Sequence, residues 1–123
     1  MTILPGTRAA ELYGAAEATE DYYCSYGVNP AYRQRLVDGG LTVSGLGGAH
    51  EIRIVELAGH PFFLATLFLP QARSAAARPH PLLAGYAAAV AERYASGRAR
   101  SRVTRTPTPA STSAPPRSEN TRS

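Results

Sequence analysis

The sequence predicts an α/β fold, because strand-like and helix-like segments alternate along its first 96 residues. Two apolar segments have the composition of strands, at residues 52–56 and 62–69. Two others carry apolar residues at helical spacing, at residues 30–38 and 80–95. The chain has 123 residues, of which 44% are hydrophobic, which suits one small domain with a core.

The first predicted elements lie before residue 40. The aromatic run at residues 22–26 is interpreted as a strand. A short helix is expected at residues 30–38, because Asn29 is a typical helix-capping residue and proline fills the first helical position. Tyr32 and Leu36 lie four residues apart, on one face of that helix, and a pair of glycines ends it.

Three strands are predicted next, beginning with a brief one at residues 41–44. After a glycine-rich turn, Ile52 and Ile54 alternate with charged neighbours, which indicates a strand with one covered face at residues 51–56. Residues 62–69 are almost all apolar, as expected for a central strand that is covered on both faces.

The last predicted element is a helix at residues 80–95, which opens with His80 and a proline. Apolar side chains recur along it at spacings of three and four residues, so they share one face. These residues are Leu82, Leu83, Tyr86, Val90 and Tyr94.

All of the net positive charge lies in the carboxyl-terminal segment, residues 97–123. Residues 1–96 have a formal charge of −1, whereas residues 97–123 carry six arginines against Glu119 and have a charge of +5. Because Val103 is its only sizeable aliphatic residue, we predict that this segment is a disordered tail. Weak contacts of its arginines with RNA or an acidic surface are an alternative, but a solubilising tail is favoured and a nucleic-acid partner is not expected.

The remaining composition excludes several classes of protein. No stretch approaches the roughly 20 apolar residues of a membrane span, and residues 1–6 do not resemble a secretory signal, so we expect a cytoplasmic protein without membrane contact. Cys24 is the only cysteine, which excludes an intramolecular disulfide. His50, His60 and His80 lack the spacing of metal ligands, so neither a metal nor a cofactor is expected.

Five blocks of sequence, in the same order, resemble the carboxyl-terminal part of the class I glutamine amidotransferase domain of CTP synthases. They are similar to the motifs PGTxAxxxYG, YEVNxxYR, HPFF, FHPE and RPHPLF of that family. A group of short proteins related to this region, some of them selenoproteins, is also similar. The blocks are residues 5–14, 26–33, 60–63, 68–71 and 78–82.

This resemblance implies a partial three-layer α/β/α sandwich. It also implies a family reaction, in which a Cys-His-Glu triad hydrolyses glutamine and the ammonia aminates UTP to CTP in pyrimidine biosynthesis. The family histidine falls at Leu69 and the glutamate at Gln71, and the family cysteine falls before Met1. Because Leu69 offers no general base, a contribution of about 10²–10⁴-fold to the rate is lost, and we predict a pseudoenzyme without glutaminase activity.

The resemblance also bears on glutamine binding and on partners. The basic stretch with which the family holds glutamine is replaced by residues 21–25, so binding of glutamine should be weak. Half of a sandwich would leave a sheet edge and an apolar face exposed. Aggregation, or pairing with another protein chain that completes the sheet, is therefore expected.

Two alternative functions are left open. The segment around Cys24 is similar to a YxCxYG pattern, so Cys24 is a candidate reactive thiol of a thiol-dependent enzyme or redox protein. A buried cysteine on an aromatic strand is the favoured interpretation, since no basic residue lies within three positions of it. The second alternative is a non-catalytic interaction module that works through the basic tail.

Overall fold

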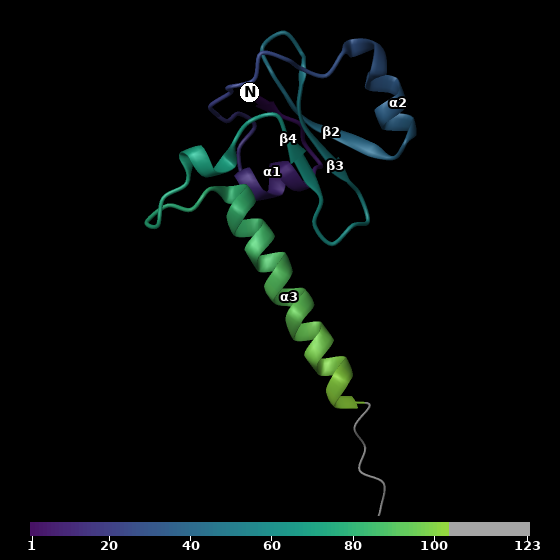
Figure 1. Ribbon diagram of the computed structural model, residues 1–123, viewed down its shortest axis with the longest axis vertical. Coiled ribbons are helices and arrows are strands. Elements are labelled where there is room, and N and C mark those ends of the chain that lie inside the picture. Colours follow the sequence, from purple (N-terminus) through teal and green to yellow (C-terminus); the bar gives the residue numbers. More distant parts are fainter. Residues whose placement is uncertain (104–123) are drawn as a thin grey trace, which may run out of the picture.

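The computed structural model describes residues 1–103 of the chain. These residues form a four-stranded antiparallel sheet with helices against it, which confirms the predicted α/β class (Figure 1). The strands, which neighbour one another in chain order, are β1 (Thr2–Ile3), β2 (Leu41–Leu46), β3 (Ile52–Leu57) and β4 (Leu64–Thr66). The helices are α1 (Arg8–Tyr13), α2 (Arg33–Asp38) and α3 (Pro81–Val103), with 3-10 turns η1 (Pro30–Tyr32) and η2 (Pro70–Arg73).

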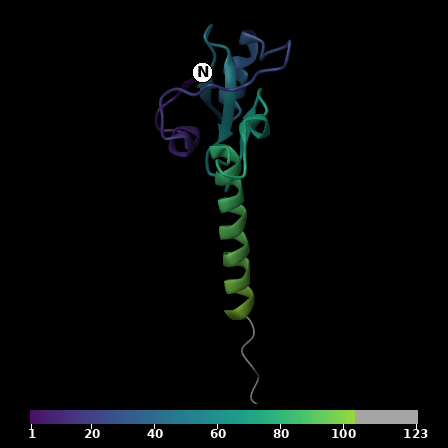
Figure 2. The ribbon, with the colours of Figure 1, turned by 90° about the vertical axis from the view of Figure 1, so that its left-hand side faces the viewer.

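Helices cover both faces of the sheet, as in a partial α/β/α sandwich. Neighbouring residues of β3 point to opposite faces: Ile54 belongs to a cluster that includes residues of α1 and α3, and Val55 to a cluster that includes Leu36 of α2. Figure 2 shows α1 to one side of the strands and α3 leaving the body below them. Phe68 and Leu82 complete the core beside α1, and both are at least 96% buried.

Several predicted elements are confirmed. Residues 30–38 are helical, as η1 and α2, and the side chain of Asn29 accepts a hydrogen bond from the amide of Ala31 (3.0 Å). Along β3, residues alternate between buried and half-buried, as the alternating pattern predicts. Helix α3 begins where it was expected, at Pro81.

Helix α1 and strand β1 were not predicted, although the signal for α1 was present. Thr7 caps the helix, since its Oγ1 accepts a hydrogen bond from the amide of Ala10 (3.1 Å), and Gly14 ends it in the left-handed conformation with φ 62°. The buried carboxylate of Glu56, on β3, accepts a further hydrogen bond from the amide of Arg8 (2.9 Å). This second contact depends on the tertiary structure and has no signature in the sequence.

The prediction of a strand at residues 22–26 was wrong. The segment is a loop, in which the Tyr22 hydroxyl donates a hydrogen bond to the carbonyl of Tyr26. The guanidinium of Arg53 lies over the Tyr22 ring, 3.5 Å from its centroid. Tyr22 is therefore held by contacts that curl the loop, and aromatic composition alone did not distinguish this from an extended strand.

The prediction of a central strand at residues 62–69 was also wrong. Only Leu64–Thr66 form a strand, β4, which pairs with β3 and lies at the edge of the sheet. The other apolar residues of this run lie in different surroundings. Phe68 is buried in the core beside α1, whereas Phe63 and Leu69 are exposed. An unbroken apolar run does not by itself specify one buried strand.

Helix α3 runs to Val103, beyond the predicted end at residue 95. The first residues of the predicted tail, residues 97–103, are therefore helical, in keeping with the high helix propensity of alanine and arginine. The remainder of that segment, residues 104–123, lies outside the described residues. Among the helices that the structure describes, none has the length and apolar character needed to cross a bilayer.

Candidate functional site

The two positions at which the sequence resemblance predicts catalytic residues lie just after β4, at the start of η2. Leu69 precedes the first residue of η2, and its side chain is 48% exposed. Gln71 is exposed on the same turn. An aliphatic group and a neutral amide at this point cannot accept a proton from a nucleophile or hold a charged imidazole.

Cys24 lies in the loop before η1, and its thiol is exposed. The expectation of a buried cysteine on a strand was therefore wrong, because residues 22–26 do not form a strand. Cys24 and the residues that follow it line a shallow cavity whose other wall is Leu67, two residues before Leu69. The structure thus brings the candidate thiol close to the segment between β4 and η2.

Acidic and aromatic side chains occupy residues 21–25, which the sequence resemblance predicts to stand in place of a basic stretch. The Asp21 carboxylate pairs with Arg73 of η2 at 3.0 Å, and both side chains are about 40% exposed. This pair ties the loop to the turn that carries Gln71. A carboxylate at this point would repel the carboxylate of a free amino acid, so it does not substitute for a basic side chain.

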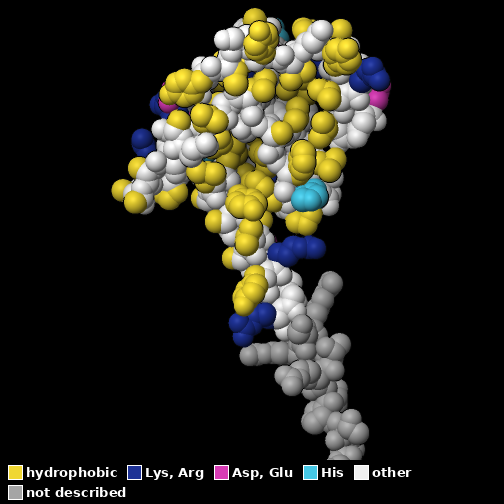
Figure 3. Space-filling model, in the orientation of Figure 1, with side chains coloured by type: hydrophobic (Ala, Val, Ile, Leu, Met, Phe, Trp, Pro, Cys, Tyr) yellow, Lys and Arg dark blue, Asp and Glu magenta, His cyan; other side chains and the backbone are white. Residues whose placement is uncertain are grey.

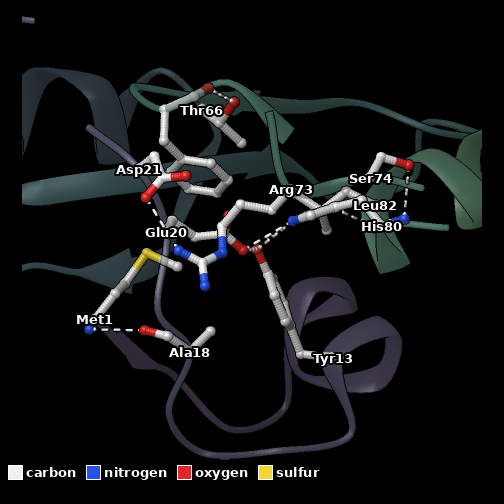
Figure 4. Close-up of polar contacts among 11 residues, drawn as sticks. Met1, Tyr13, Ala18, Glu20, Asp21, Thr66, Arg73, Ser74, His80 and Leu82 are labelled. Carbon is white, nitrogen blue, oxygen red and sulfur yellow. Dashed lines mark hydrogen bonds and ion pairs between the residues drawn. The ribbon is translucent and has the colours of Figure 1, made fainter. Parts of the chain in front are cut away.

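A buried polar cluster lies beside this turn, where Tyr13, Glu20 and His80 meet (Figure 4). Glu20 Oε1 lies 2.6 Å from the Tyr13 hydroxyl and 2.8 Å from His80 Nε2. The side chains of His80 and Glu20 are only 3% and 6% exposed. The three residues come from α1, from the loop that follows it and from the start of α3, so the cluster ties these segments together.

The hydrogen bonds define the roles of the cluster atoms. His80 Nδ1 accepts the amide proton of Leu82 (3.2 Å), so the ring proton lies on Nε2 and is donated to the Glu20 carboxylate. Burial, together with the hydrogen bond and the negative charge of Glu20, raises the pKa of Tyr13 well above its usual value of 10.0. The Tyr13 hydroxyl thus remains a donor to Glu20 at neutral pH.

The cluster is closed to substrates, and its role is structural. Its histidine and carboxylate are buried against the aromatic rings of Tyr13 and Phe68. Sequence reasoning placed His80 in a turn and did not single out Tyr13 or Glu20. Tyr13 and His80 do lie in two of the five motif blocks, but Glu20 gave no signal of its own.

The three histidines do not come together at a metal site. His60 is exposed in the β3–β4 loop, where its Nδ1 accepts the amide proton of Phe62 (3.1 Å), and His50 lies in the β2–β3 turn with φ 63°. Within residues 1–103, no group of three or more histidine, cysteine, aspartate or glutamate residues has the geometry of a cation site.

Comparisons with known proteins point to one family. No family model matches the chain. The chain is 45% identical over 84 residues to the CTP synthase of Synechococcus sp. (strain JA-2-3B'a(2-13)), which is 68% of this chain and 15% of that protein. It is 44% identical over 86 residues to the CTP synthase of Rubrobacter xylanophilus (69% and 16%), and 37% identical over 99 residues to that of Chloroflexus aggregans (80% and 18%). The chain therefore spans less than a fifth of the length of these relatives.

One solved structure extends the similarity to the fold. The glutaminase domain of CTPS from Trypanosoma brucei, with bound acivicin, superposes with a TM-score of 0.64 at 28% identity. The match covers 72% of this chain and 36% of that chain. The α/β fold of this chain thus has a counterpart in a glutaminase domain.

Proposed function

We propose that this chain, which is related to the carboxyl-terminal part of the glutamine amidotransferase domain of CTP synthases, is a non-catalytic member of that group. The observation that carries the proposal is the turn after β4, where Leu69 and Gln71 stand in place of a histidine and a glutamate. The amination of UTP is not proposed for the chain itself, because the chain matches only 15–18% of the length of these relatives.

The chemical reason is the absence of a relay at that turn. Amide hydrolysis through a covalent intermediate needs a nucleophile, a base that removes its proton and a group that orients the base. Leu69 can neither take nor return a proton. Gln71 has no charge with which to stabilise an imidazolium, and the ion pair of Asp21 with Arg73 adds a carboxylate close by.

Ammonia release from glutamine by the full chain tests this proposal. We expect no release above that of a heat-denatured sample. The double variant L69H/Q71E introduces a base and its carboxylate partner. It should remain inactive, because these two side chains have no nucleophile to activate. Release from the wild-type chain at an enzymatic rate would refute the proposal.

A second candidate function uses Cys24 as a reactive thiol. The observation that favours it is the exposure of the thiol at a cavity that Leu67 also lines, next to the altered turn. Its test is the rate of alkylation by iodoacetamide as a function of pH, with C24S as the blank. A midpoint near that of an unperturbed thiol, about 8.5, would argue against a reactive cysteine.

We further propose that another protein chain completes the sheet along β4. This strand pairs with β3 on one side, and its residue Ala65 is exposed. An open edge with free amide and carbonyl groups is a template for an added strand. The bonds from Leu57 N to Phe63 O and from Leu67 N to Arg53 O direct the amide of Ala65 toward β3 and that of Thr66 toward the open edge. Substituting Thr66 by proline would remove one edge amide, so we expect T66P to weaken any such association.

A further inference from the structure

An apolar groove runs along α3, on the part of the helix that projects from the body. Its floor is formed by Phe62 of the β3–β4 loop and by Tyr86, Val90 and Tyr94 of α3. Phe62 and Tyr86 pack edge to face, with ring centroids 5.6 Å apart, yet Tyr86, Val90 and Tyr94 are each at least 50% exposed. Figure 3 shows hydrophobic side chains following α3 down from the body, with basic side chains beside them.

Basic side chains border this groove. The guanidinium of Arg8 lies over the Phe62 ring (5.8 Å to its centroid), and its Nη1 donates to the carbonyl of Pro61 (3.0 Å). Arg93 lines the groove and also, with Arg8 and Glu92, the cavity beside it, and Arg98 lies over the Tyr94 ring (5.7 Å). Three arginines and one carboxylate therefore border the apolar groove.

We propose that this groove binds an acidic amphipathic helix of a partner protein. Tyr86, Val90 and Tyr94 are spaced four residues apart, and a ridge of that kind receives apolar side chains at the same spacing on a facing helix. From Tyr86 to Arg98, α3 rises roughly 18 Å, the length of about three helical turns. Carboxylates on the flanks of the partner helix would pair with Arg8, Arg93 and Arg98.

The charges disfavour a second copy of this chain as the occupant. Each copy would bring three arginines, Arg8, Arg93 and Arg98, and a single carboxylate, Glu92, to the interface. Like charges would then outnumber opposite charges across it. An acidic partner replaces this repulsion by attraction.

A nucleic acid is also disfavoured as the occupant. Surfaces that bind nucleic acid are more polar and more positively charged than those that bind protein. Here the centre of the groove is Val90, Ala89 and Phe62, which offer no partner to a phosphate. The proposal concerns a surface apart from the turn after β4, so it stands or falls independently of the absence of glutaminase activity.

A designed peptide tests the proposal with the full chain. The probe is a fluorescein-labelled, helix-forming peptide of 14 residues, with leucines four apart on one face and glutamates at both ends. We expect saturable binding in fluorescence anisotropy, and at least tenfold weaker binding of a peptide in which lysines replace the glutamates. R93E and R98E should each weaken binding of the acidic peptide at least fivefold.

Matched controls make the outcome decisive. R35E changes the charge equally on α2, away from the groove, and should leave binding unchanged. Y86A tests the apolar floor and should weaken binding at least fivefold; its circular dichroism should match that of the wild type, because Tyr86 is 56% exposed.

Five results would overturn the proposal. The acidic peptide fails to bind, or the lysine peptide binds equally well. R35E weakens binding as much as R98E does. The chain sediments as a dimer that V90E converts to a monomer, which would make a second copy the occupant. A single-stranded oligonucleotide displaces the acidic peptide at a lower concentration than the unlabelled peptide does.

Discussion

At the scale of single residues, a buried hydrogen-bonded cluster contributes more to holding the fold together than any residue of the expected active site. Leu69 and Gln71 lie on an exposed turn, whereas Tyr13, Glu20 and His80 are joined by contacts of 2.6 and 2.8 Å. A buried carboxylate is costly unless donors satisfy it. Both donors contact Oε1 of Glu20, while its Oε2 is buried without a protein partner within the described residues.

Removing the imidazole from this cluster should destabilise the fold. H80A leaves the buried Glu20 carboxylate with one donor fewer and removes the acceptor of the Leu82 amide, so we expect a loss of about 3 kcal/mol in the free energy of unfolding. The measurement is urea denaturation followed by circular dichroism. The control is H60A, at an exposed histidine, for which we expect a loss below about 1 kcal/mol. Equal losses for the two variants would show that burial of His80 has no special role.

The raised pKa of Tyr13 makes the fold sensitive to alkaline pH. Because the pKa of Tyr13 is higher in the folded than in the unfolded chain, the unfolded chain loses this proton first, from pH about 10 upward. The contribution to stability is therefore complete below pH 10 and declines as pH rises above it. We expect the urea midpoint of the wild type to fall more steeply than that of Y13F between pH 9 and pH 11. Parallel curves would contradict this assignment.

At the scale of elements, the pairing of β2 with β3 is irregular. Val43 pairs with Val55, Gly45 with Ile54 and Leu46 with Ile52. One residue of β2, Ser44, and then one of β3, Arg53, is skipped, so the register is restored beyond the irregularity. The glycine is required by a close approach. A Cβ on Gly45 would lie 2.7 Å from Cγ1 of Ile54, a residue that is fully buried in the core.

Substitution of this glycine should therefore be costly. We expect G45A to lower the free energy of unfolding by about 1–3 kcal/mol, because the Ile54 side chain must shift within a packed core. The matched control is G48A in the adjacent turn, where an added Cβ meets nothing within 4 Å and the change should be within about 0.5 kcal/mol. Denaturation curves that are the same for both variants would contradict the proposed contact.

The two ends of α3 have different roles. Leu82 is 4% exposed in the core beside α1, whereas Val90 is 50% exposed on the groove. We expect L82A to cost about 2–4 kcal/mol of stability and V90A less than about 1 kcal/mol. Thermal unfolding of both variants measures the difference, and a larger loss for V90A would show that the groove is already filled by part of this chain.

At the scale of the whole molecule, the body is compact while α3 extends from it. The core lies between the sheet, α1 and the first turn of α3, where an added Cβ on Gly85 would meet the side chain of Leu12. Beyond that turn, most side chains of α3 up to residue 98 are exposed. The body does not need the far part of α3 for its own packing, so that part is available for binding.

The sequence correctly predicted the parts of this architecture that depend on local interactions. Asn29 with the following proline marked the start of the helix at residues 30–38, and the alternation around Ile52 marked β3. The sequence was misleading where one pattern of residues is compatible with two structural environments. The apolar run at residues 62–69 divides between an edge strand, a core residue and exposed positions. In the loop at residues 22–26, Arg53 holds Tyr22, while Tyr23 and Tyr26 are exposed.

The sequence by itself determined the α/β class and the family resemblance, and it led to the prediction that Leu69 and Gln71 cannot carry a proton, because residue identity alone decides whether a side chain can do so. The tertiary structure decided which residues meet. It joined Tyr13, Glu20 and His80 from three segments, exposed Cys24 beside Leu67, and left an apolar groove bordered by arginines. Such contacts join residues that are distant along the chain, so no local pattern of the sequence contains them.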